Sequence, residues 1–577
     1  MDKVNAKQAK TIILILVIAA IIISLCRCFL GVDTTDEALY IADPLFVAHG
    51  STPYVNNWLQ TPGFSFFLAP VVGLYELFFP EHQGIFLFMR LFFLAVKILV
   101  YIAIYFLFRN TRYKYAAMLV AIPLISSYFG MIPSFNYTNI PLLGLFITGM
   151  LLLYQWYAKE KRDIRLLPFI CGIILACITL CSPTQIFNCI LMMVFYFFFI
   201  DKRACCRYVI GGFTTALLFT LYMVIRAGSI LGLISCLETF LNHPYFSFGA
   251  STLSWQAYTI LPLAVGQFIP YAVCVLVIEV LRRLVIKKHA FMWSCKNGLI
   301  VGAFCGLLIN LMRYGQYALW NRAIILLSIG SFFFRFISGS KGVNRLFDFV
   351  AIPEMFAFLG MALTVYGGAA GRFYVFTPMA LICLLYIYDT LKEQIGVRSF
   401  YISAVYVCLF LVVIFKYEFK TIYGEFVDGG YAPLSVITTQ IKEGIYTGVY
   451  TTEQKAPALQ ELESYIRLNT NAEEYVLFMD RAPMAYLMTD ANACSPTSWD
   501  PVLYTEGYEG GPAMLWDYFA VADQTPDKII YIQTEKDRPL SIEQEDYEFS
   551  QYVMQNYSLD NESVIEDMYR VLIYNKD

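Results

Sequence analysis

Three carboxylates crowd a short stretch, GVDTTDEALYIADPLF at residues 31–46, that directly follows a long apolar run. They belong to Asp33, Asp36 and Glu37. A carboxylate can take the proton of an attacking hydroxyl as a general base, and a neighbouring acid can orient the acceptor or raise the pKa of that base. The position of these acids, where the chain leaves an apolar segment, predicts proton-transfer chemistry at a membrane surface.

Arginines are the second group of residues that could do chemistry, because a guanidinium can hold a phosphate bidentately. Ionisable groups at membrane depth usually face a cavity or a partner. The alternative is that these side chains snorkel to the interface or pair with the three acids. Lysines are nearly absent where these arginines lie, at or near the outer ends of predicted spans. The set is Arg27, Arg90, Arg226, Arg313, Arg322 and Arg372.

Carboxylates above a membrane and arginines just below it suggest a lipid phosphate as donor and a hydroxyl as acceptor. The arginines would stabilise the charge that develops on the departing phosphate. Lys97, in the middle of an apolar run, is a further cation whose orientation the helical phase does not reveal. The expected substrate-binding set is completed by Asp33 and by two residues from the stretch that follows the acids, Tyr54 and Gln60.

Histidines and aromatic residues leave alternatives open. His49, His82 and His243 could form a divalent-metal site with the acids, or they could be ordinary surface histidines. No Cys/His spacing matches a zinc site, so no metal ligand is assigned and no cofactor is certain. The segment PSFNYTN, residues 133–139, could line a cavity or form a simple turn. Aromatic residues that could stack on a sugar, cover a polyprenyl chain or simply pack are Tyr54, Trp58, Tyr317 and Trp320.

The composition shows what must position these residues. Of the 577 residues, 58% are hydrophobic and only 15% are charged, and the mean hydropathy is +0.59, which indicates a polytopic membrane protein. About 20 apolar residues are needed for each span. We expect about thirteen transmembrane helices, near residues 11–30, 84–108, 115–131, 140–157, 168–182, 185–200, 208–226, 257–281, 298–311, 322–338, 347–367, 374–391 and 399–415.

Lysines and arginines in short loops set the orientation of these spans. They gather in segments such as KEKRDIR and DKRACCR, whereas the 33–83 loop contains none. We therefore expect a cytoplasmic N-terminus in a plasma (inner) membrane, with the 33–83 loop and the C-terminal region both outside. Inside that loop we expect two helices flat on the outer surface; the alternative, that the second one crosses the membrane, would invert the later topology.

The last part of the chain differs in charge and pattern. Residues 417–577 carry 28 Asp/Glu against 10 Lys/Arg and a single cysteine, Cys494, so no internal disulfide framework is possible there. Helical spacing over APALQELESYIRLN and buried-strand patterns in EYVLFMD, KIIYIQT and YRVLIYNK predict a small α/β domain. The predicted division is a transmembrane domain at 1–416 and an extracytoplasmic α/β domain at 417–577. The basic residues of the first part follow membrane topology and do not indicate nucleic acid.

The stretch DEALYIADPLFVAHG…PY…WLQTPGFSFFL resembles the first external loop of the C-type (GT-C) glycosyltransferases, in the branch with the aminoarabinose transferase and the protein O-mannosyltransferases. AAGRFYVFTPMALI, residues 369–382, is similar to a segment that begins a late span in many relatives. The resemblance implies a GT-C fold, a polyprenyl-phosphate-sugar donor, Asp36 as catalytic base and Glu37 as its neighbour. Some relatives have a basic phosphate-binding residue just before the proline of the loop, but here Thr61 precedes Pro62, so phosphate contact would fall to the arginines.

These observations predict a membrane glycosyltransferase that moves a sugar from a polyprenyl-phosphate donor to an extracytoplasmic acceptor, with inversion. The acceptor, whether glycan, lipid or protein, is not encoded in any motif. The alternative is a multi-span lipid or solute transporter, which would place its site near the midplane with discontinuous helices and internal repeats. A structural membrane scaffold is a third reading, but it would not explain a loop that excludes Lys and Arg and opens with carboxylates.

Overall fold

The computed structural model describes most of the chain and positions the acids of the 33–83 loop. The described residues are 6–59, 61–111, 113–128, 132–157, 166–241, 269, 272–286, 291–312, 388, 392, 395–427, 430–499, 511–533, 540–543 and 548–577.

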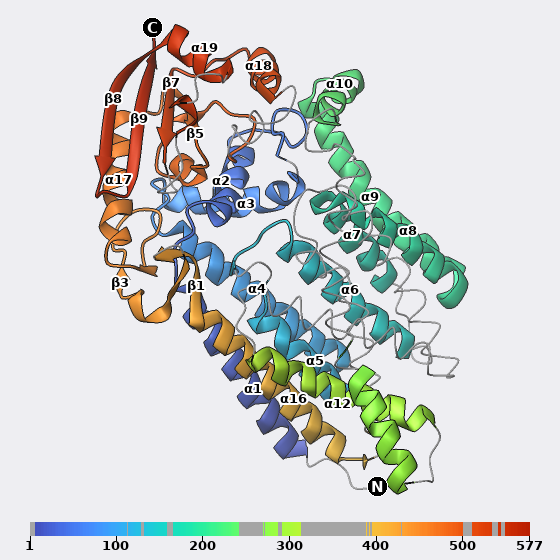
Figure 1. Ribbon diagram of the computed structural model, residues 1–577. Helices are drawn as coiled ribbons and strands as arrows, with labels where there is room; N and C mark the ends of the chain where they lie inside the picture. The colour runs from blue at the N-terminus through green and yellow to red at the C-terminus, as the bar shows by residue number, and fades with distance from the viewer. Residues whose placement is uncertain are drawn as a thin grey trace.

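The first 420 residues are helical in the described part. A bundle of helices, with two shorter helices at one end, accounts for this region (Figure 1). The helices are α1 (Ala6–Cys28), α2 (Asp36–Ala48), α3 (Gly63–Phe78), α4 (Ile85–Phe108), α5 (Lys114–Ser126), α6 (Asn139–Tyr157), α7 (Leu166–Cys181), α8 (Ile186–Phe195), α9 (Lys202–Arg226), α10 (Ile230–Leu241), α12 (Phe291–Met312) and α16 (Arg398–Lys420).

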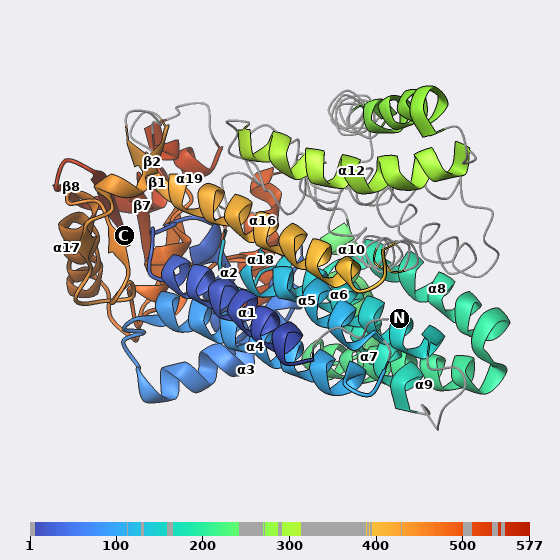
Figure 2. The same cartoon turned by 90° about the horizontal axis from the view of Figure 1, so that it is seen from below.

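Four described helices are long and apolar enough to cross a membrane: α1, α4, α9 and α16. Helices α5 to α8 are shorter and also apolar, and they lie where further spans are predicted. The expected total of about thirteen is not confirmed among the described residues. The predicted spans at 322–338 and 347–367, most of the one at 374–391 and more than half of the one at 257–281 lie outside them. Helices α1 and α16 pack side by side, with α5 against both (Figure 2).

The 33–83 loop contains two helices, α2 and α3, as predicted. Helix α3 is not among the helices long enough to span. Helix α2 differs from the expected surface helix, because every residue from Glu37 to Val47 is buried. It packs against α3, α4 and the 3₁₀ helix η7 (Pro483–Leu487) of the C-terminal part. Its apolar sequence is therefore explained by burial inside the protein.

The C-terminal part contains a five-stranded mixed sheet of order β6-β5-β7-β9-β8 and two short antiparallel pairs, β1-β2 and β3-β4. It lies beside α2 and α3, at the end of the bundle opposite the N-terminus (Figure 1). The strands are β1 (Thr421–Val427), β2 (Gly430–Pro433), β3 (Thr439–Gln440), β4 (Tyr450–Thr451), β5 (Tyr475–Met479), β6 (Asn492–Ala493), β7 (Lys528–Ile532), β8 (Tyr557–Ile565) and β9 (Tyr569–Lys576), and the helices are α17 (Lys455–Asn469), α18 (Gly511–Ala522) and α19 (Glu548–Asn556).

Candidate active site around Asp36

Asp33 caps the start of α2 through its side chain. Its carboxylate accepts hydrogen bonds from the backbone N–H of Thr35 at 3.0 Å and of Glu37 at 2.9 Å, and from the Thr35 hydroxyl at 2.8 Å. These bonds satisfy backbone donors that a helix N-terminus leaves unpaired. Burial, with the nearby Asp36 charge as a smaller contribution, raises the pKa of Asp33 to about 6. The geometry makes Asp33 a capping residue of the loop.

Glu37 is fully buried and forms an ion pair with Arg90 of α4. The Arg90 Nε donates to Glu37 Oε1 at 2.8 Å, and Nη2 donates to Oε2 at 2.5 Å. The remaining Arg90 bonds go to the carbonyls of Cys28, Leu30 and Gly31 at 3.0, 3.3 and 2.8 Å. A guanidinium has five N–H donors, and all five are used here. The expected phosphate contact of Arg90 would require one of these bonds to open.

Asp36 lies between these two fixed acids and is partly exposed. Its Oδ2 accepts a hydrogen bond from the Tyr423 hydroxyl of β1 at 2.7 Å. Burial raises the pKa of Asp36, whereas the Tyr423 hydrogen bond and the positive charge of Arg481 act to lower it. A raised pKa brings a carboxylate closer to the proton affinity that a general base needs.

Arg481 reaches this region from the turn after β5. Asp480 and Arg481 both have positive φ angles, 68° and 61°, in the left-handed region that non-glycine residues seldom adopt. The Asp480 carboxylate accepts the backbone N–H of Ser541 at 3.2 Å, which helps to hold the turn. Strained backbone of this kind persists where the surrounding structure fixes it, often at functional sites.

Asp43 lies two turns after Asp36 on α2 and is completely buried. It accepts hydrogen bonds from Asn57 at 3.1 Å, from Ser498 at 3.4 Å and from the Ser65 hydroxyl. Burial raises its pKa to about 6 although each of these bonds lowers it. Asp43 thereby joins α2 to α3 and to the C-terminal domain.

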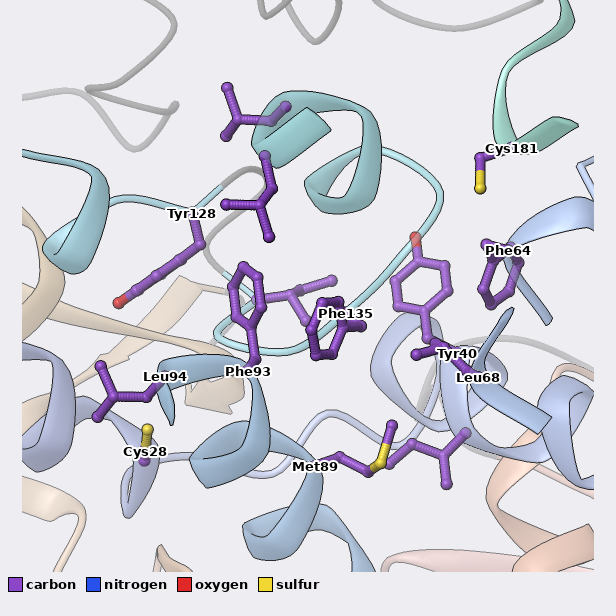
Figure 3. Packing of buried hydrophobic residues seen from close by; sticks show 14 of the residues in the cluster. Cys28, Tyr40, Phe64, Leu68, Met89, Phe93, Leu94, Tyr128, Phe135 and Cys181 are labelled. Atoms are coloured by element: carbon purple, nitrogen blue, oxygen red, sulfur yellow. The ribbon is translucent and has the colours of Figure 1, made fainter. Parts of the chain in front are cut away.

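An aromatic cluster lies beside Asp36 on α2. The ring of Tyr40 is 5.7 Å from that of Phe64 on α3 and 5.6 Å from that of Tyr137. Tyr137 belongs to the PSFNYTN segment, which the sequence left open between a cavity wall and a turn. It turns tightly around Asn136, which accepts three hydrogen bonds, and it also packs against the 33–83 loop. Figure 3 shows Tyr40 and Phe64 facing each other in this core.

Two more of the predicted arginines are described. The Nε of Arg27 lies 3.4 Å from Glu418 of α16, and its Nη1 donates to the Leu30 carbonyl. Arg226, at the end of α9, donates to the Thr52 hydroxyl at 2.8 Å and to the Gly50 carbonyl. Arg226 therefore contacts the 33–83 loop.

Lys97 lies deeper in the bundle than Arg90 and is buried. Its ammonium is 3.3 Å from the Ser127 carbonyl and 4.6 and 5.3 Å from the ring centroids of Phe93 and Tyr128. The Tyr128 hydroxyl in turn donates to Glu418. Cation–π contacts and a hydrogen-bonded carboxylate nearby are the usual means of keeping buried charge in an apolar bundle.

Two of the three histidines that could form a divalent-metal site are described. His49 Nε2 lies 2.8 Å from Glu76, and His82 Nε2 lies 3.5 Å from the same carboxylate. The Nδ1–H of His82 donates to the Leu487 carbonyl at 3.1 Å. Among the described residues, no group of three or more His, Cys, Asp or Glu side chains is arranged to hold a metal ion. His243 lies outside the described residues.

The aromatic candidates that are described lie in the packing between the loop and the C-terminal domain. Trp58 is buried, donates from Nε1 to the Val55 carbonyl at 3.0 Å and packs edge-on against Tyr518 of α18. Tyr54 has a positive φ of 64° and packs against the same cluster. The other predicted site residues lie outside the described part: Gln60, Arg313, Arg322, Arg372, Tyr317 and Trp320.

Three residues near the acids were not identified from the sequence: Asp43, Tyr423 and Arg481. Asp43 had a signal, since an acid within the apolar run DEALYIADPLF is unusual. Tyr423 and Arg481 had none, because their relevance depends on how the C-terminal domain docks. An apolar pocket between α5, α12 and α16, lined by Phe304, Tyr406 and Phe410 among others, includes none of the candidate residues.

The chain was compared with known proteins and solved structures. No protein-family model matches the chain, and no curated protein matches it. Among solved structures it resembles the crystal structure of the Archaeoglobus fulgidus oligosaccharyltransferase in complex with Zn and sulfate, with 11% identity over 89% of this chain and 67% of that chain, at a TM-score of 0.45.

Proposed function

We propose that the protein is a membrane glycosyltransferase that uses a polyprenyl-phosphate-linked sugar as donor and transfers the sugar to a hydroxyl on an extracytoplasmic acceptor. One observation carries the proposal. Of the three acids that follow α1, Asp33 and Glu37 are buried and occupied by the fold, whereas Asp36 is partly exposed and has one oxygen held by Tyr423. Asp36 is therefore the acid of this group that we propose accepts the proton of the acceptor hydroxyl.

In the proposed reaction the acceptor oxygen attacks the anomeric carbon of the sugar. The bond from that carbon to the phosphate oxygen breaks with inversion, the acceptor proton passes to Asp36, and the polyprenyl phosphate leaves with the bonding electron pair. The leaving phosphate needs positive charge nearby more than it needs an acid. We propose Arg226 for this role among the described residues, and Arg313, Arg322 and Arg372 stay predictions.

Positions along α1 and α2 support a site at the membrane surface. Helix α1 is long and apolar enough to span, and Asp36 begins the next helix, eight residues after α1 ends at Cys28. The C-terminal domain packs on the same end of the bundle. We propose that this end is extracytoplasmic, because basic residues are excluded from the 33–83 loop.

The central experiment compares Asp36→Asn with Asp33→Asn in purified protein supplied with a panel of polyprenyl-phosphate sugars. Asp36→Asn keeps the shape but cannot accept a proton, so transfer should fall by ~10²–10⁴ while donor binding persists. Asp33→Asn can still accept hydrogen bonds at the helix start, so its loss should be within ~1 kcal/mol of stability. An Asp36→Asn protein of normal rate would remove Asp36 as the base.

Orientation is tested separately by cysteine labelling in a Cys-depleted background. Glu81→Cys and Glu473→Cys change exposed positions in the loop and in the C-terminal domain, and Arg203→Cys changes an exposed position at the opposite end. A membrane-impermeant reagent should label the first two in intact cells and the third only after permeabilisation. Labelling of Arg203→Cys alone in intact cells would reverse the proposed topology.

Transport of a lipid or solute is a second candidate, favoured by the buried charges of Lys97 and Arg27 and by the half-buried Glu418 beside Arg27. Intramembrane ionisable groups commonly mark transport pathways. The two candidates differ in one measurement, because a transporter moves its substrate across proteoliposomes without forming a new glycosidic bond. Lys97→Met should abolish such movement if Lys97 belongs to the pathway, whereas the Asp36 variant should spare it.

A further inference from the structure

The segment that leads from α1 to Asp36 is held along its length by the C-terminal domain. The backbone N–H of Tyr450 in β4 donates to the Phe29 carbonyl at 2.7 Å, and the Gly31 N–H donates back to the Tyr450 carbonyl at 2.9 Å. The Val32 N–H then donates to the Glu425 carboxylate of β1 at 2.6 Å. A segment of the first domain is thus paired with strands that lie about 400 residues later in the chain.

A buried ion pair between Lys455 and Glu425 stabilises this contact. The Lys455 ammonium, at the start of α17, donates to the carbonyls of Val32 and Gly424 at 2.7 Å each and lies 3.4 Å from Glu425 Oε2. Glu425 is completely buried and also accepts the Thr451 hydroxyl at 2.6 Å. Buried charges are retained only where partners and hydrogen bonds compensate their desolvation, so Glu425 and Lys455 depend on this contact.

The segment at 29–33 and strand β1 approach each other so closely that each needs a glycine at the contact. At Gly31, with φ +79°, an added Cβ would lie 2.3 Å from the Ile422 side chain and 3.0 Å from the Tyr423 carbonyl oxygen. At Gly424, with φ +81°, it would lie 2.7 Å from the Val32 carbonyl oxygen and 2.8 Å from Asp33 Cα. Both positions combine a left-handed backbone with backbone-to-backbone contact, which only glycine accommodates without displacement.

Tyr423 extends this contact to the candidate base. Tyr423 and Glu425 of β1 both contact the segment at 32–36, from a part of the strand where the pairing with β2 is irregular. Glu425 binds Val32, and the Tyr423 hydroxyl binds Asp36 Oδ2 at 2.7 Å. The Tyr423 ring is supported by the ring of Tyr431 in β2, with centroids 5.7 Å apart.

We infer that the C-terminal domain positions the Asp36 carboxylate, with Tyr423 as the positioning residue and the contact of β1, β4 and α17 with residues 29–33 as its support. The chemical meaning of this inference rests on the proposed function. The domain is then not a separate cap on the bundle but a part of the structure that orients the base.

Loss of the Tyr423 hydroxyl has a defined effect on proton transfer. The ionisable groups around Asp36 are Asp33, Tyr40, Tyr423 and Arg481. Donation from Tyr423 favours the ionised carboxylate and lowers its pKa. Tyr423→Phe should therefore move the acid limb of the pH profile of kcat/KM upward by about one pH unit, the size expected for one hydrogen bond to a charged group.

The matched control is Tyr557→Phe. Tyr557 is a buried tyrosine of the same domain whose hydroxyl donates to the Pro526 carbonyl at 2.8 Å, away from the loop. It should leave the acid limb where it is in the unchanged protein. A Tyr423→Phe profile that falls equally at all pH values, with the limb unmoved, would overturn the positioning role.

A second measurement does not depend on any sugar transfer. Gly424→Ala should separate β1 from the loop, so that the backbone amides of Gly31 and Val32 exchange hydrogen at least tenfold faster in the full-length protein. Gly228→Ala is the control, because Gly228 has nearly the same φ, +76°, but nothing within 4 Å of an added Cβ. Unchanged exchange in Gly424→Ala would overturn the domain contact itself. Faster exchange in Gly424→Ala, together with no transferase activity in the unchanged protein, would retain the contact and reject only the proposed function.

Discussion

Glu37 and Arg90 form a bidentate ion pair in which both side chains are almost fully buried, between the first turn of α2 and the first turns of α4. The pair ties the loop acids to a candidate membrane span. Because Arg90 also binds three carbonyls at the end of α1, it fixes the point where the chain leaves the bundle. Glu37 is thereby a structural neighbour of Asp36 more than an orienting group for the acceptor.

Breaking this pair should destabilise the protein strongly. Arg90→Gln leaves Glu37 charged and buried without its partner, a change that typically costs ~3–5 kcal/mol. We expect a clearly lower thermal midpoint in detergent, with part of the loss recovered in the double variant Glu37→Gln, Arg90→Gln.

Arg570→Gln provides the comparison, since Arg570 pairs with Glu543 and Glu562 on the partly exposed surface, where such pairs contribute ~0–1 kcal/mol. An Arg90→Gln protein that melts like the unchanged protein but no longer uses donor would return Arg90 to the role of phosphate ligand.

Much of the fold follows from patterns that can be read locally. The apolar runs at 11–30, 84–108 and 399–415 lie within α1, α4 and α16 or extend beyond them by a residue or two, and β5, β7 and β9 lie in the segments with buried-strand patterns. Strand β8 was not predicted, because the side chains of its central residues are exposed and polar. Its position at the sheet edge is set by pairing with β9, which leaves no alternating pattern in its own sequence.

The candidate site was less predictable, since its contacts join distant parts of the chain. The Tyr423 hydroxyl and Asp36 are 387 residues apart, and Glu37 and Arg90 are 53 residues apart. Periodicity identifies the elements that carry such residues but not which elements meet. The sequence therefore predicts that the arginines lie near one face, but it could not name their partners.

Asp43 gives a pH-dependent contribution to stability. Its pKa is raised to about 6 in the folded protein from an ordinary value of 3.8. The folded state then binds the proton more tightly than the unfolded state, so stability from this group is fully present below pH ~4 and is lost as the pH rises through about 6. Because Asn at position 43 cannot ionise, Asp43→Asn should be more stable relative to the unchanged protein at pH 7.5 than it is at pH 4.5.

The measurement is the difference in thermal midpoint between Asp43→Asn and the unchanged protein as a function of pH. The difference should grow between pH 4 and 6 and level off above, in favour of Asn. A constant difference over this range would mean that the pKa of Asp43 does not change on folding.

His82 should change the folding stability with pH in the opposite direction to Asp43. Burial lowers its pKa from 6.5, against smaller contributions from the Leu487 carbonyl and Glu76 that raise it. The unfolded chain then takes up the proton first, so stability from this residue is present above pH ~6.5 and is lost as the pH falls below it. His82→Asn should remove this acid-side loss, since Asn tolerates the positive φ of 57° at this position and does not titrate.

His49→Asn is the control for His82, because His49 contacts the same Glu76 carboxylate but is 55% exposed. It should leave the pH dependence of the thermal midpoint between pH 5 and 7 almost unchanged. Equal effects of the two substitutions would indicate that the shared Glu76 contact, and not the burial of His82, sets the dependence.

Arg481 is expected to act on Asp36 through its charge. Arg481→Asn removes the charge while keeping a residue that tolerates the left-handed backbone at φ 61°, so the pKa of Asp36 should rise further and the acid limb of kcat/KM should move to higher pH. Arg481→Lys keeps a positive charge and should leave the limb near its original position. Both variants are compared with the unchanged protein over pH 4.5 to 8 at limiting and at saturating donor. If Arg481→Asn instead raises KM for the donor and the limb stays in place, the guanidinium binds the donor phosphate and does not tune the base, because a contact to substrate alters affinity without altering the proton equilibrium of the free enzyme.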